Sequence, residues 1–320
     1  MNKEKRECVY CRKKNVIKKG RQKIRFGFKQ VFYCKDCKRR FIDEGLSNKM
    51  YSTKIIVNSL SYYNLGNTLE ETAKLVNKQF RVRISKSSVF EWLNEFRWLG
   101  YLKLRDGILK KYGKSVLVNK QFVHNGLAYN FRYHKGKLGL CQFEGVINYV
   151  KGFENGCPKF FNDIENRCSQ LKVDIDVVKK TSEDDVCRIA ELALGMCDRR
   201  SERHMVVENF MLINDNRTIA VEVPVWLWEK NFDFGISGHV DLLQVRDGKV
   251  YVMDYKPDAR KENTKKVGSQ LYFYASGLSF RTGIKLGNFR CVWFDDRNYF
   301  EFNPMEVKVR FPGSKWRSGR

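Results

Sequence analysis

The sequence predicts a multidomain α/β protein whose 320 residues suffice for two or three domains. Three features indicate this fold class: two C-x-x-C pairs in a basic amino-terminal segment, two capped helical patterns joined by a short turn, and a carboxy-terminal run of strand patterns with a helical pattern at each side. The predicted segments are a four-cysteine zinc-binding segment at 1–45, a helix-turn-helix domain at 46–104, a connecting, helical region of unassigned type at 105–180, an α/β core at 181–304 and a basic tail at 305–320.

The charge of the chain favours a polyanionic partner. Lysine and arginine number 61 against 36 aspartate and glutamate, which gives a net charge of +25. Residues 1–44 alone hold 16 basic and 5 acidic residues. Basic clusters bind nucleic acid by releasing counterions from its phosphates, so we expect DNA as the partner. A solvated basic surface without a ligand is the alternative.

The chain shows no sign of a membrane segment. Its sequence contains no apolar stretch long enough to span a bilayer, and its start, Met1 to Arg6, is charged. We therefore expect an intracellular, cytoplasmic protein that associates with DNA and with no membrane. The sequence does not indicate an oligomeric state.

Four cysteines have the spacing of a metal site. Cys8 and Cys11 form one C-x-x-C pair, and Cys34 and Cys37 form another after 22 intervening residues. Each pair can sit at a tight turn, so four thiolates can converge on one structural Zn²⁺, whose binding would help so small a segment to fold. Iron takes the same ligands and stays open as an alternative. The six remaining cysteines are spread singly and are expected in the core: Cys141, Cys157, Cys168, Cys187, Cys197 and Cys291.

Helical patterns follow the cysteines. Short strand patterns at 15–21 and 30–33 give way to apolar residues at helical spacing over 50–65. Thr68 and Glu71 then form a capping box, and a serine at the start of Ser85–Leu93 opens a further helix after a brief turn. Two capped helices joined in this way are typical of a helix-turn-helix.

The carboxy-terminal half combines strand and helix patterns. Asp247-Gly248 predicts a tight hairpin turn, and the run as a whole predicts an α/β sandwich. A strand-like pattern at 121–134 stands apart from it. The predicted elements are a helix at 183–197, strands at 205–213 and 218–228, hairpin strands at 240–245 and 250–255, a helix at 265–280 and a strand at 289–294.

Two acids and a lysine on the predicted hairpin form a candidate cation site. Asp241 lies before the turn, and Asp254 and Lys256 lie after it, two residues apart and therefore on one face of the strand. Two carboxylates and one backbone carbonyl suit Mg²⁺. Lys256 would orient the attacking water and balance the negative transition state of phosphodiester hydrolysis.

Each of these residues also has a purely structural interpretation. Asp254 and Lys256 could form an exposed ion pair on an edge strand, and Asp241 could cap a turn. His239 could be a surface neighbour. Gln270 and Tyr274, one helical turn apart, could be a packed pair. Their joint order along the chain favours a catalytic site.

The amino-terminal motifs resemble a known module. Cys8-Val-Tyr-Cys11 and Gln30-Val-Phe-Tyr-Cys34-Lys-Asp-Cys37-Lys-Arg-Arg-Phe41 resemble the zinc ribbon of insertion-sequence transposases, in which a helix-turn-helix follows. The resemblance covers roughly the first third of the chain. It implies binding to duplex DNA by the second helix, and a ribbon that contacts proteins is the alternative. The expected DNA contacts are Lys86, Ser87 and Ser88 of that helix, with Arg39 and Arg40 of the basic ribbon.

The carboxy-terminal half contains four motifs in order, namely Glu208, Gly238-His-Val-Asp241, Asp254-Tyr-Lys256 and Gln270-Leu-Tyr-Phe-Tyr274. Together they resemble the PD-(D/E)XK nuclease superfamily, and in particular its RecB-like branch. The resemblance covers about residues 182–304 and implies a restriction-endonuclease-like α/β/α core with a mixed sheet.

The resemblance assigns a role to each of these residues. It implies that Asp241, Asp254 and the carbonyl of Tyr255 bind Mg²⁺ or Mn²⁺, and that Lys256 is catalytic. Glu208 would add an acidic contact. Gln270 and Tyr274 would steady the site or the DNA.

Two departures from that branch stand out. A metal-binding histidine is common on its first helix, but residues 183–197 contain none; Cys187 or Glu191 stands there instead. His204 lies beyond the predicted helix and is expected to be a poor substitute. No cysteine group follows Cys291, so an iron–sulfur cluster is not expected.

The sequence therefore predicts a metal-dependent DNA nuclease, a hydrolase of phosphodiester bonds, that its amino-terminal domains bring to DNA. One alternative is a non-catalytic DNA-binding regulator that has kept a nuclease fold. Another is a transposase-related protein of a mobile element, whose usual RNase H-like acidic triad has no convincing counterpart in residues 105–320.

Overall fold

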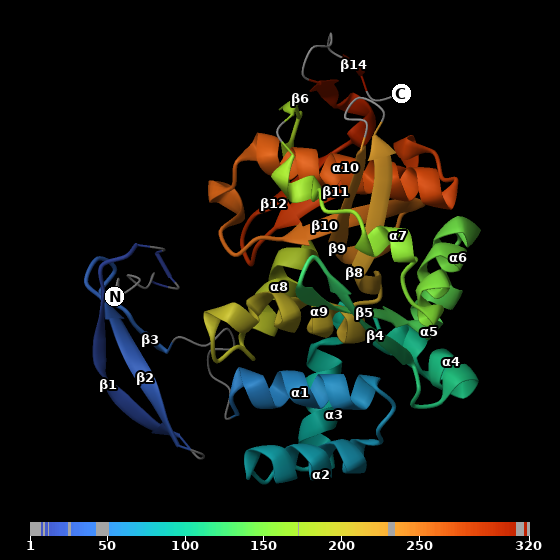
Figure 1. Cartoon of the computed structure of the whole chain (residues 1–320). Helices are drawn as coiled ribbons and strands as arrows, with labels where there is room; N and C mark the ends of the chain where they lie inside the picture. The colour runs from blue at the N-terminus through green and yellow to red at the C-terminus, as the bar shows by residue number, and fades with distance from the viewer. Residues whose placement is uncertain are drawn as a thin grey trace. The chain divides into compact units, whose positions relative to one another are not determined.

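The computed structural model of the chain describes residues 8, 10–11, 13–24, 27–42, 51–171, 173–229, 234–311 and 317–318. Two compact units contain them, one formed by residues 1–63 and 67–94 and the other by residues 64–66 and 95–320 (Figure 1). Each of the five predicted segments has some residues outside the described ones: 1–7, 9, 12, 25–26 and 43–45 of the zinc segment, 46–50 of the helix-turn-helix domain, 172 of the connecting region, 230–233 of the α/β core, and 312–316 and 319–320 of the basic tail.

The amino-terminal unit begins with a small antiparallel sheet. Strands β1 (Val16–Ile24), β2 (Gly27–Cys34) and β3 (Arg40–Ile42) pair in the order β1-β2-β3. Among the side chains that the structure describes, the buried core of the sheet consists of Phe32, Phe41, Cys8 and Cys34. The rings of Phe32 and Phe41 are stacked with centroids 5.8 Å apart.

Three helices complete this unit: α1 (Thr53–Asn64), α2 (Leu69–Phe80) and α3 (Lys86–Glu95). The predicted capping box is confirmed, since the amide of Glu71 donates to Thr68 Oγ1 at 3.1 Å and the amide of Thr68 donates to Glu71 Oε2 at 2.8 Å. The side chain of Asn77 closes the connection to α3 by exchanging two hydrogen bonds with the backbone of Ile84. The turn between α2 and α3 is therefore fixed at both ends.

The carboxy-terminal unit is built on a mixed sheet of eight strands, in the order β4-β5-β8-β9-β10-β11-β12-β7. Strands β10 and β11 run parallel, and their neighbours on either side are antiparallel. A mixed α/β fold is thereby confirmed. The strands are β4 (Leu117–His124), β5 (Leu127–His134), β7 (Lys180–Thr181), β8 (Thr218–Glu229), β9 (Phe234–Arg246), β10 (Lys249–Tyr255), β11 (Phe289–Phe294) and β12 (Tyr299–Phe302).

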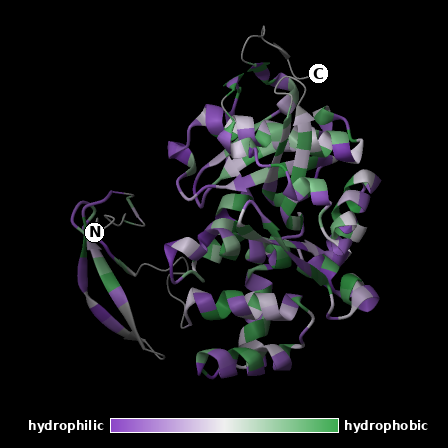
Figure 2. Ribbon diagram, viewed as in Figure 1, coloured by the Kyte–Doolittle hydropathy of each residue, from purple (hydrophilic) through white to green (hydrophobic). Residues whose placement is uncertain are grey.

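Helices cover the sheet on two sides. Helix α10 (Thr264–Thr282) lies on one side of the strands, whereas α8 (Asp185–Leu194) and α9 (Arg203–Asn214) lie on the other (Figure 1). The central strands are apolar along most of their length, as the green segments of Figure 2 show. This burial of both faces explains why the sequence of β10 is an almost continuous apolar run.

Shorter elements surround this core. The helices are α4 (Leu102–Tyr112), α5 (Lys135–Gly139), α6 (Glu144–Gly152) and α7 (Lys159–Asn162). The 3₁₀ turns are η1 (Arg97–Leu99), η2 (Phe153–Asn155), η3 (Cys168–Gln170), η4 (Arg200–Glu202), η5 (Ala259–Lys261), η6 (Leu286–Asn288) and η7 (Pro304–Glu306). A second sheet joins β6 (Asp174–Asp176), β13 (Lys308–Arg310) and β14 (Arg317–Ser318).

Most of the predicted elements of the carboxy-terminal half are confirmed, including the turn at Asp247 and Gly248, whose φ angles are 51° and 70°. Two predictions are wrong. Residues 205–213 belong to helix α9 and not to a strand. Residues 121–134 are not one strand, because Asn125 and Gly126 take positive φ angles and turn the chain into the β4–β5 hairpin.

The six single cysteines follow the prediction in part. Cys168, Cys187 and Cys291 are buried, while Cys141, Cys157 and Cys197 are half-buried. Among the residues that the structure describes, no helix combines the length and the apolar character needed to cross a bilayer.

Candidate active site

A cavity of about 230 Å³ opens beside strands β8, β9 and β10 of the carboxy-terminal unit. It brings together five predicted site residues that are distant in sequence: Asp241, Asp254, Lys256, Gln270 and Tyr274. The other residues that line it are His124, Tyr129, Arg167, Ser169, His204, Glu222, Gly238 and His239.

The hairpin register places the two aspartates next to each other. Leu242 pairs with Met253, so Asp241 and Asp254 are the next residues along the two strands. The amide of Tyr255 donates to Asp241 Oδ2 at 3.0 Å and holds that carboxylate in place. Asp254 is 1% exposed and lies on a strand between β9 and β11, which excludes an exposed pair on an edge strand. Asp241 lies inside β9, so it does not cap a turn.

Lys256 and the helix α10 complete this group. Lys256 Nζ lies 2.7 Å from Asp254 Oδ2. Gln270 donates from Nε2 to Asp254 Oδ1 at 3.4 Å and to the Tyr274 hydroxyl at 3.2 Å. Gly238 has no side chain because a Cβ there would stand 2.3 Å from the ring of Tyr274. Gln270 and Tyr274 therefore form a packed pair that also contacts the acidic group.

A second set of ligands approaches Asp241 from helix α9. One ligand atom each of His204, Glu208 and Asp241 lies within 4.8 Å of the others, and His204 Nδ1 is 3.6 Å from Asp241 Oδ2. His204 was expected to be a poor substitute for the missing histidine, but residues 203–214 form a helix that places it one turn before Glu208 and beside Asp241. Carboxylate oxygens with one imidazole nitrogen are donors that fit Mg²⁺ or Mn²⁺.

The site concentrates acidic groups. Burial, together with the charges of Glu222 and Asp241, holds the pKa of Glu208 well above its ordinary value. Burial and the neighbouring charge of Asp241 also raise the pKa of Glu222 to about 8 and that of Asp254 to about 7. Burial alone would raise the pKa of Asp241 too, but its positively charged neighbours His204 and Lys256 lower it. The protein thus keeps a cluster of acids that a cation would stabilise in the ionised form.

Several residues of the site were not predicted from the sequence. Glu222 adopts φ 51° within β8, opposite Asp241 in the strand register, and such a conformation of a non-glycine residue often marks a functional site. Arg132 of β5 places its guanidinium 3.6 Å from Glu208 and neutralises part of its charge. The β4–β5 hairpin also supplies two lining residues, His124 and Tyr129. Only the His204-to-Glu208 spacing gave a sequence signal, and it appears once the segment is known to be helical.

The interpretation of His239 as a surface residue is wrong. It is 6% exposed and does not lie on the surface as a neighbour of the site. Its ring stacks on Tyr129 with centroids 3.6 Å apart and planes inclined by 3°. Its Nε2 lies 3.1 Å from His124 Nδ1. The rings of His239, Tyr129 and His124 together line one side of the cavity.

The acid cluster predicts an unusual pH dependence of stability. In the protein without added Mg²⁺ or Mn²⁺, Glu222 and Asp254 keep their protons up to about pH 8 and 7, whereas ordinary carboxyl groups of the unfolded chain lose theirs near pH 4. The native state then binds more protons than the unfolded state between about pH 4 and 8, so the free energy of unfolding should fall as the pH rises through this window.

Thermal unfolding followed by circular dichroism at pH 5, 6, 7 and 8 measures this effect. We expect Mn²⁺ to raise the Tm more at pH 8 than at pH 5, because protons compete with the ion for the carboxylates. The matched variant Glu222→Gln should lose part of the pH dependence. An equal Mn²⁺-induced shift at all four pH values would contradict the prediction.

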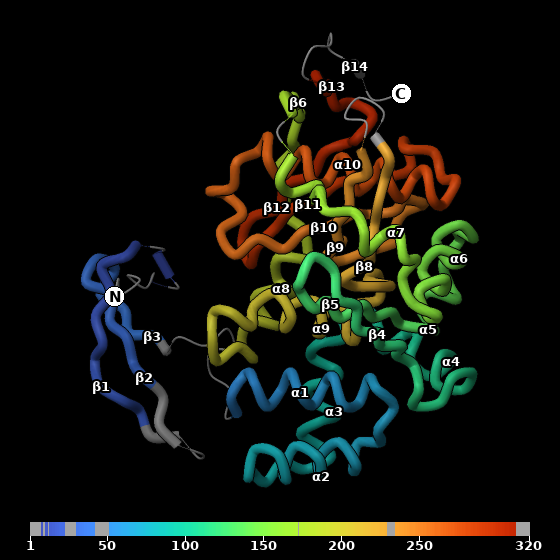
Figure 3. The backbone as a smooth tube through the Cα atoms, in the orientation of Figure 1, coloured from blue at the N-terminus to red at the C-terminus, as the bar shows by residue number. Residues whose placement is uncertain are grey.

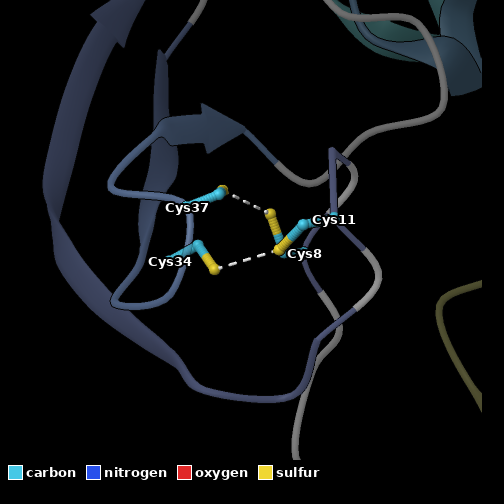
Figure 4. A group of neighbouring side chains, drawn as sticks. All are labelled: Cys8, Cys11, Cys34 and Cys37. Atoms are coloured by element: carbon cyan, nitrogen blue, oxygen red, sulfur yellow. Dashed lines mark hydrogen bonds between the residues drawn. The ribbon is translucent and has the colours of Figure 1, made fainter.

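The four amino-terminal cysteines converge in the same way as the acids. Cys8 Sγ lies 3.5 Å from Cys37 Sγ, and Cys11 Sγ lies 3.5 Å from Cys34 Sγ (Figure 4). All four sulfurs lie within 4.8 Å of one another, close to the spacing of about 3.8 Å that follows from tetrahedral Zn–S bonds of about 2.3 Å. The predicted four-cysteine cluster is therefore present and its donors fit one tetrahedral metal ion.

The predicted DNA-contacting residues occupy the surface of the amino-terminal unit. Arg39 and Arg40 are exposed, and the guanidinium of Arg39 lies 5.2 Å from the centre of the Tyr10 ring. Ser87 and Lys86 are exposed at the start of α3, and Lys86 Nζ pairs with Glu70 of α2 at 3.0 Å. Ser88 is half-buried and its amide donates to Ser85 Oγ.

Comparison with known proteins agrees with the geometry of the cavity. Residues 164–305 match the family model of the PD-(D/E)XK nuclease superfamily, a span that includes the residues from His204 to Tyr274. The β4–β5 hairpin precedes this span. The chain matches no curated protein and no solved structure. The carboxy-terminal part of the chain is thus similar to the PD-(D/E)XK superfamily, whose members are usually nucleases that use divalent metal ions.

Proposed function

We propose that this protein is a metal-dependent DNA nuclease that its amino-terminal unit brings to duplex DNA. The observation that carries the proposal is the convergence of Asp241, Asp254 and Lys256 in one cavity, with His204 and Glu208 beside them. Two acidic groups, a lysine and an adjacent set of metal donors are the components of phosphodiester hydrolysis. The family match over residues 164–305 supports the same chemistry.

The contacts of each side chain support a division of roles. His204, Glu208 and Asp241 would hold Mg²⁺ or Mn²⁺. Asp254 and the carbonyl of Tyr255 would be further ligands, as the resemblance implies. Such an ion supplies Lewis-acid stabilisation of the phosphate and lowers the pKa of a bound water. His204 supplies the histidine that the resemblance to the RecB-like branch implies and that residues 183–197 lack.

Lys256 and its partners act on the attacking water. The ammonium group of Lys256, held 2.7 Å from Asp254, would orient the water and balance the charge of the transition state. Gln270 fixes the other oxygen of Asp254, and Tyr274 fixes Gln270. Because Asp254 is buried, the salt bridge to Lys256 holds both side chains in one arrangement.

The amino-terminal unit supports targeting to DNA. A four-cysteine cluster on a small sheet, followed by the capped helices α2 and α3, fits the zinc ribbon and helix-turn-helix of the insertion-sequence transposases that its motifs resemble. We infer a structural Zn²⁺ in the cluster. Arg39, Arg40, Lys86 and Ser87 would contact the DNA backbone and base edges, and Ser88 would fix the start of α3.

Incubation of the purified chain with circular and linear duplex DNA tests the proposal. We expect cleavage with Mg²⁺ or Mn²⁺ and none without added divalent ion. Direct nicking of the circle indicates an endonuclease, and loss of the linear form alone indicates an exonuclease. Intact DNA in every metal-containing reaction, at protein concentrations that shift the duplex in a gel, would overturn the proposal.

A further inference from the structure

A second groove, with a volume of about 450 Å³, lies in the carboxy-terminal unit beside the end of strand β8. Aromatic side chains dominate it, and two of them are open to solvent: Trp228 is 61% exposed and Phe160 is 50% exposed. The guanidinium of Arg281 lies 4.6 Å from the centre of the Trp226 ring. The groove is lined by α7 and the chain that follows it, by strands β8 and β9, and by Arg281 of α10.

The groove and the catalytic cavity share one wall. The connection from α7 to β6, which Figure 3 shows as a lime-green tube, lines the groove with Ile164 to Asn166 and the cavity with Arg167 and Ser169. This wall is fixed to β9, because the amide of Ser237 donates to the carbonyl of Asn166 at 2.9 Å. Strand β9 also lines both, the groove with Gly235 and the cavity with Gly238.

The groove and the catalytic cavity are close enough for one DNA strand to reach both. Trp226 of the groove stands four residues from Glu222 of the cavity along β8, which corresponds to about 13 Å at about 3.3 Å per residue. A strand whose phosphodiester lies in the cavity therefore reaches the groove within a few nucleotides. Each site has an arginine for the strand's phosphates, Arg167 in the cavity and Arg281 in the groove.

We propose that this groove binds the unpaired bases of the DNA strand whose phosphodiester lies in the catalytic cavity. The proposal rests on the proposed function and adds the form of the substrate, a duplex with a single-stranded segment or end. Exposed rings with an adjacent guanidinium bind bases by stacking, and this mode tolerates any sequence because every base has a π-face.

The chemistry of the groove favours unpaired bases over paired ones. Bases in a duplex are stacked on one another and offer only their edges, whereas an unpaired base can lie flat on Trp228 or Phe160. Asp163 and Glu165 also border the groove and would repel phosphates. The backbone of the bound strand would therefore lie on the Arg281 side, with its bases against the rings.

Binding of a twelve-residue oligothymidylate, measured by fluorescence anisotropy near 150 mM salt, tests the groove. All proteins carry Asp241→Asn so that the oligonucleotide stays intact. We expect Trp228→Ala with Phe160→Ala to weaken binding by on the order of tenfold for each ring removed. Trp228→Phe should keep most of the affinity because a ring remains. The control Leu140→Ala removes an equally exposed apolar side chain elsewhere, 62% exposed in the native chain, and should change nothing.

Cleavage assays separate the groove from the catalytic site. In the chain with Asp241 intact, we expect faster cutting of a duplex with a single-stranded overhang than of a blunt duplex, and loss of this preference in the double alanine variant. Unchanged oligothymidylate binding in that variant would overturn the groove proposal, even if the chain cleaves DNA. A peptide would then be the next candidate ligand of the groove. A third outcome is that the native chain cleaves no DNA, but the double alanine variant binds oligothymidylate more weakly. In that case the proposed function fails and the groove proposal stands.

Discussion

Replacing Asp241 by asparagine should lower metal-dependent DNA cleavage by about a thousandfold or more and leave duplex binding intact. Asparagine has the size of aspartate and can still accept the hydrogen bond from the amide of Tyr255. It lacks the negative charge that faces His204 and Lys256, so the metal donors lose their central carboxylate. The expected loss is therefore one of chemistry and not of folding.

The measurement compares initial rates of plasmid nicking and linear DNA loss, with circular dichroism to verify the fold. Asp176→Asn is the matched control, because it removes the same charge from an exposed position on β6 that lies outside the cavity. The Lys256→Ala variant should lose activity to a similar extent. Cleavage by Asp241→Asn within threefold of the native chain would show that another group holds the metal ion.

Replacing Cys34 by serine should unfold the amino-terminal sheet and abolish high-affinity binding to duplex DNA. Cys34 is fully buried, and its amide donates to the carbonyl of Arg39 at 3.0 Å, so its side chain and backbone both fix the cluster. In the described part of this sheet, the buried core around Cys34 consists of Cys8 and two phenylalanines. Metal binding by small Cys-rich modules contributes about 10–16 kcal/mol, which this core cannot replace.

Metal content by mass spectrometry and duplex binding by gel shift measure this effect together. We expect one zinc ion per native chain and less than a tenth of that in Cys34→Ser, with the thermal transition of the carboxy-terminal unit unchanged. Cys157→Ser, at a half-buried cysteine outside the cluster, is the matched control. Retention of zinc and of duplex binding by Cys34→Ser would exclude a structural role for the four cysteines.

The sequence predicted those parts of the site that local geometry determines. Asp247-Gly248 specifies a two-residue turn. The register of this hairpin brings Asp241 next to Asp254 and depends only on the local sequence. Gln270 and Tyr274 face the same side of a helix because they are four residues apart. The spacing of the four cysteines was sufficient to predict their cluster.

Long-range pairing and an ambiguous apolar run account for what was missed. Met205 to Ile213 is short and largely apolar, and such a run fits a strand or a buried helix equally well, so the helical spacing of His204 and Glu208 was not recognised. The β4–β5 hairpin joins the sheet through pairs such as Arg132 with Val221, which no local pattern reveals. Arg132, Tyr129 and His124 could therefore not be assigned to the site from the sequence.

The parallel pairing of β10 with β11 has a consequence for how the site is inherited. A parallel pair requires a crossover, and here α10 provides it, so residues 249–294 form one β-α-β unit. With the adjoining strand β9, this unit carries Asp241, Asp254, Lys256, Gln270 and Tyr274. Genetic recombination can thus transfer these five residues as one contiguous segment, whereas the metal donors His204 and Glu208 must come from the preceding helix α9.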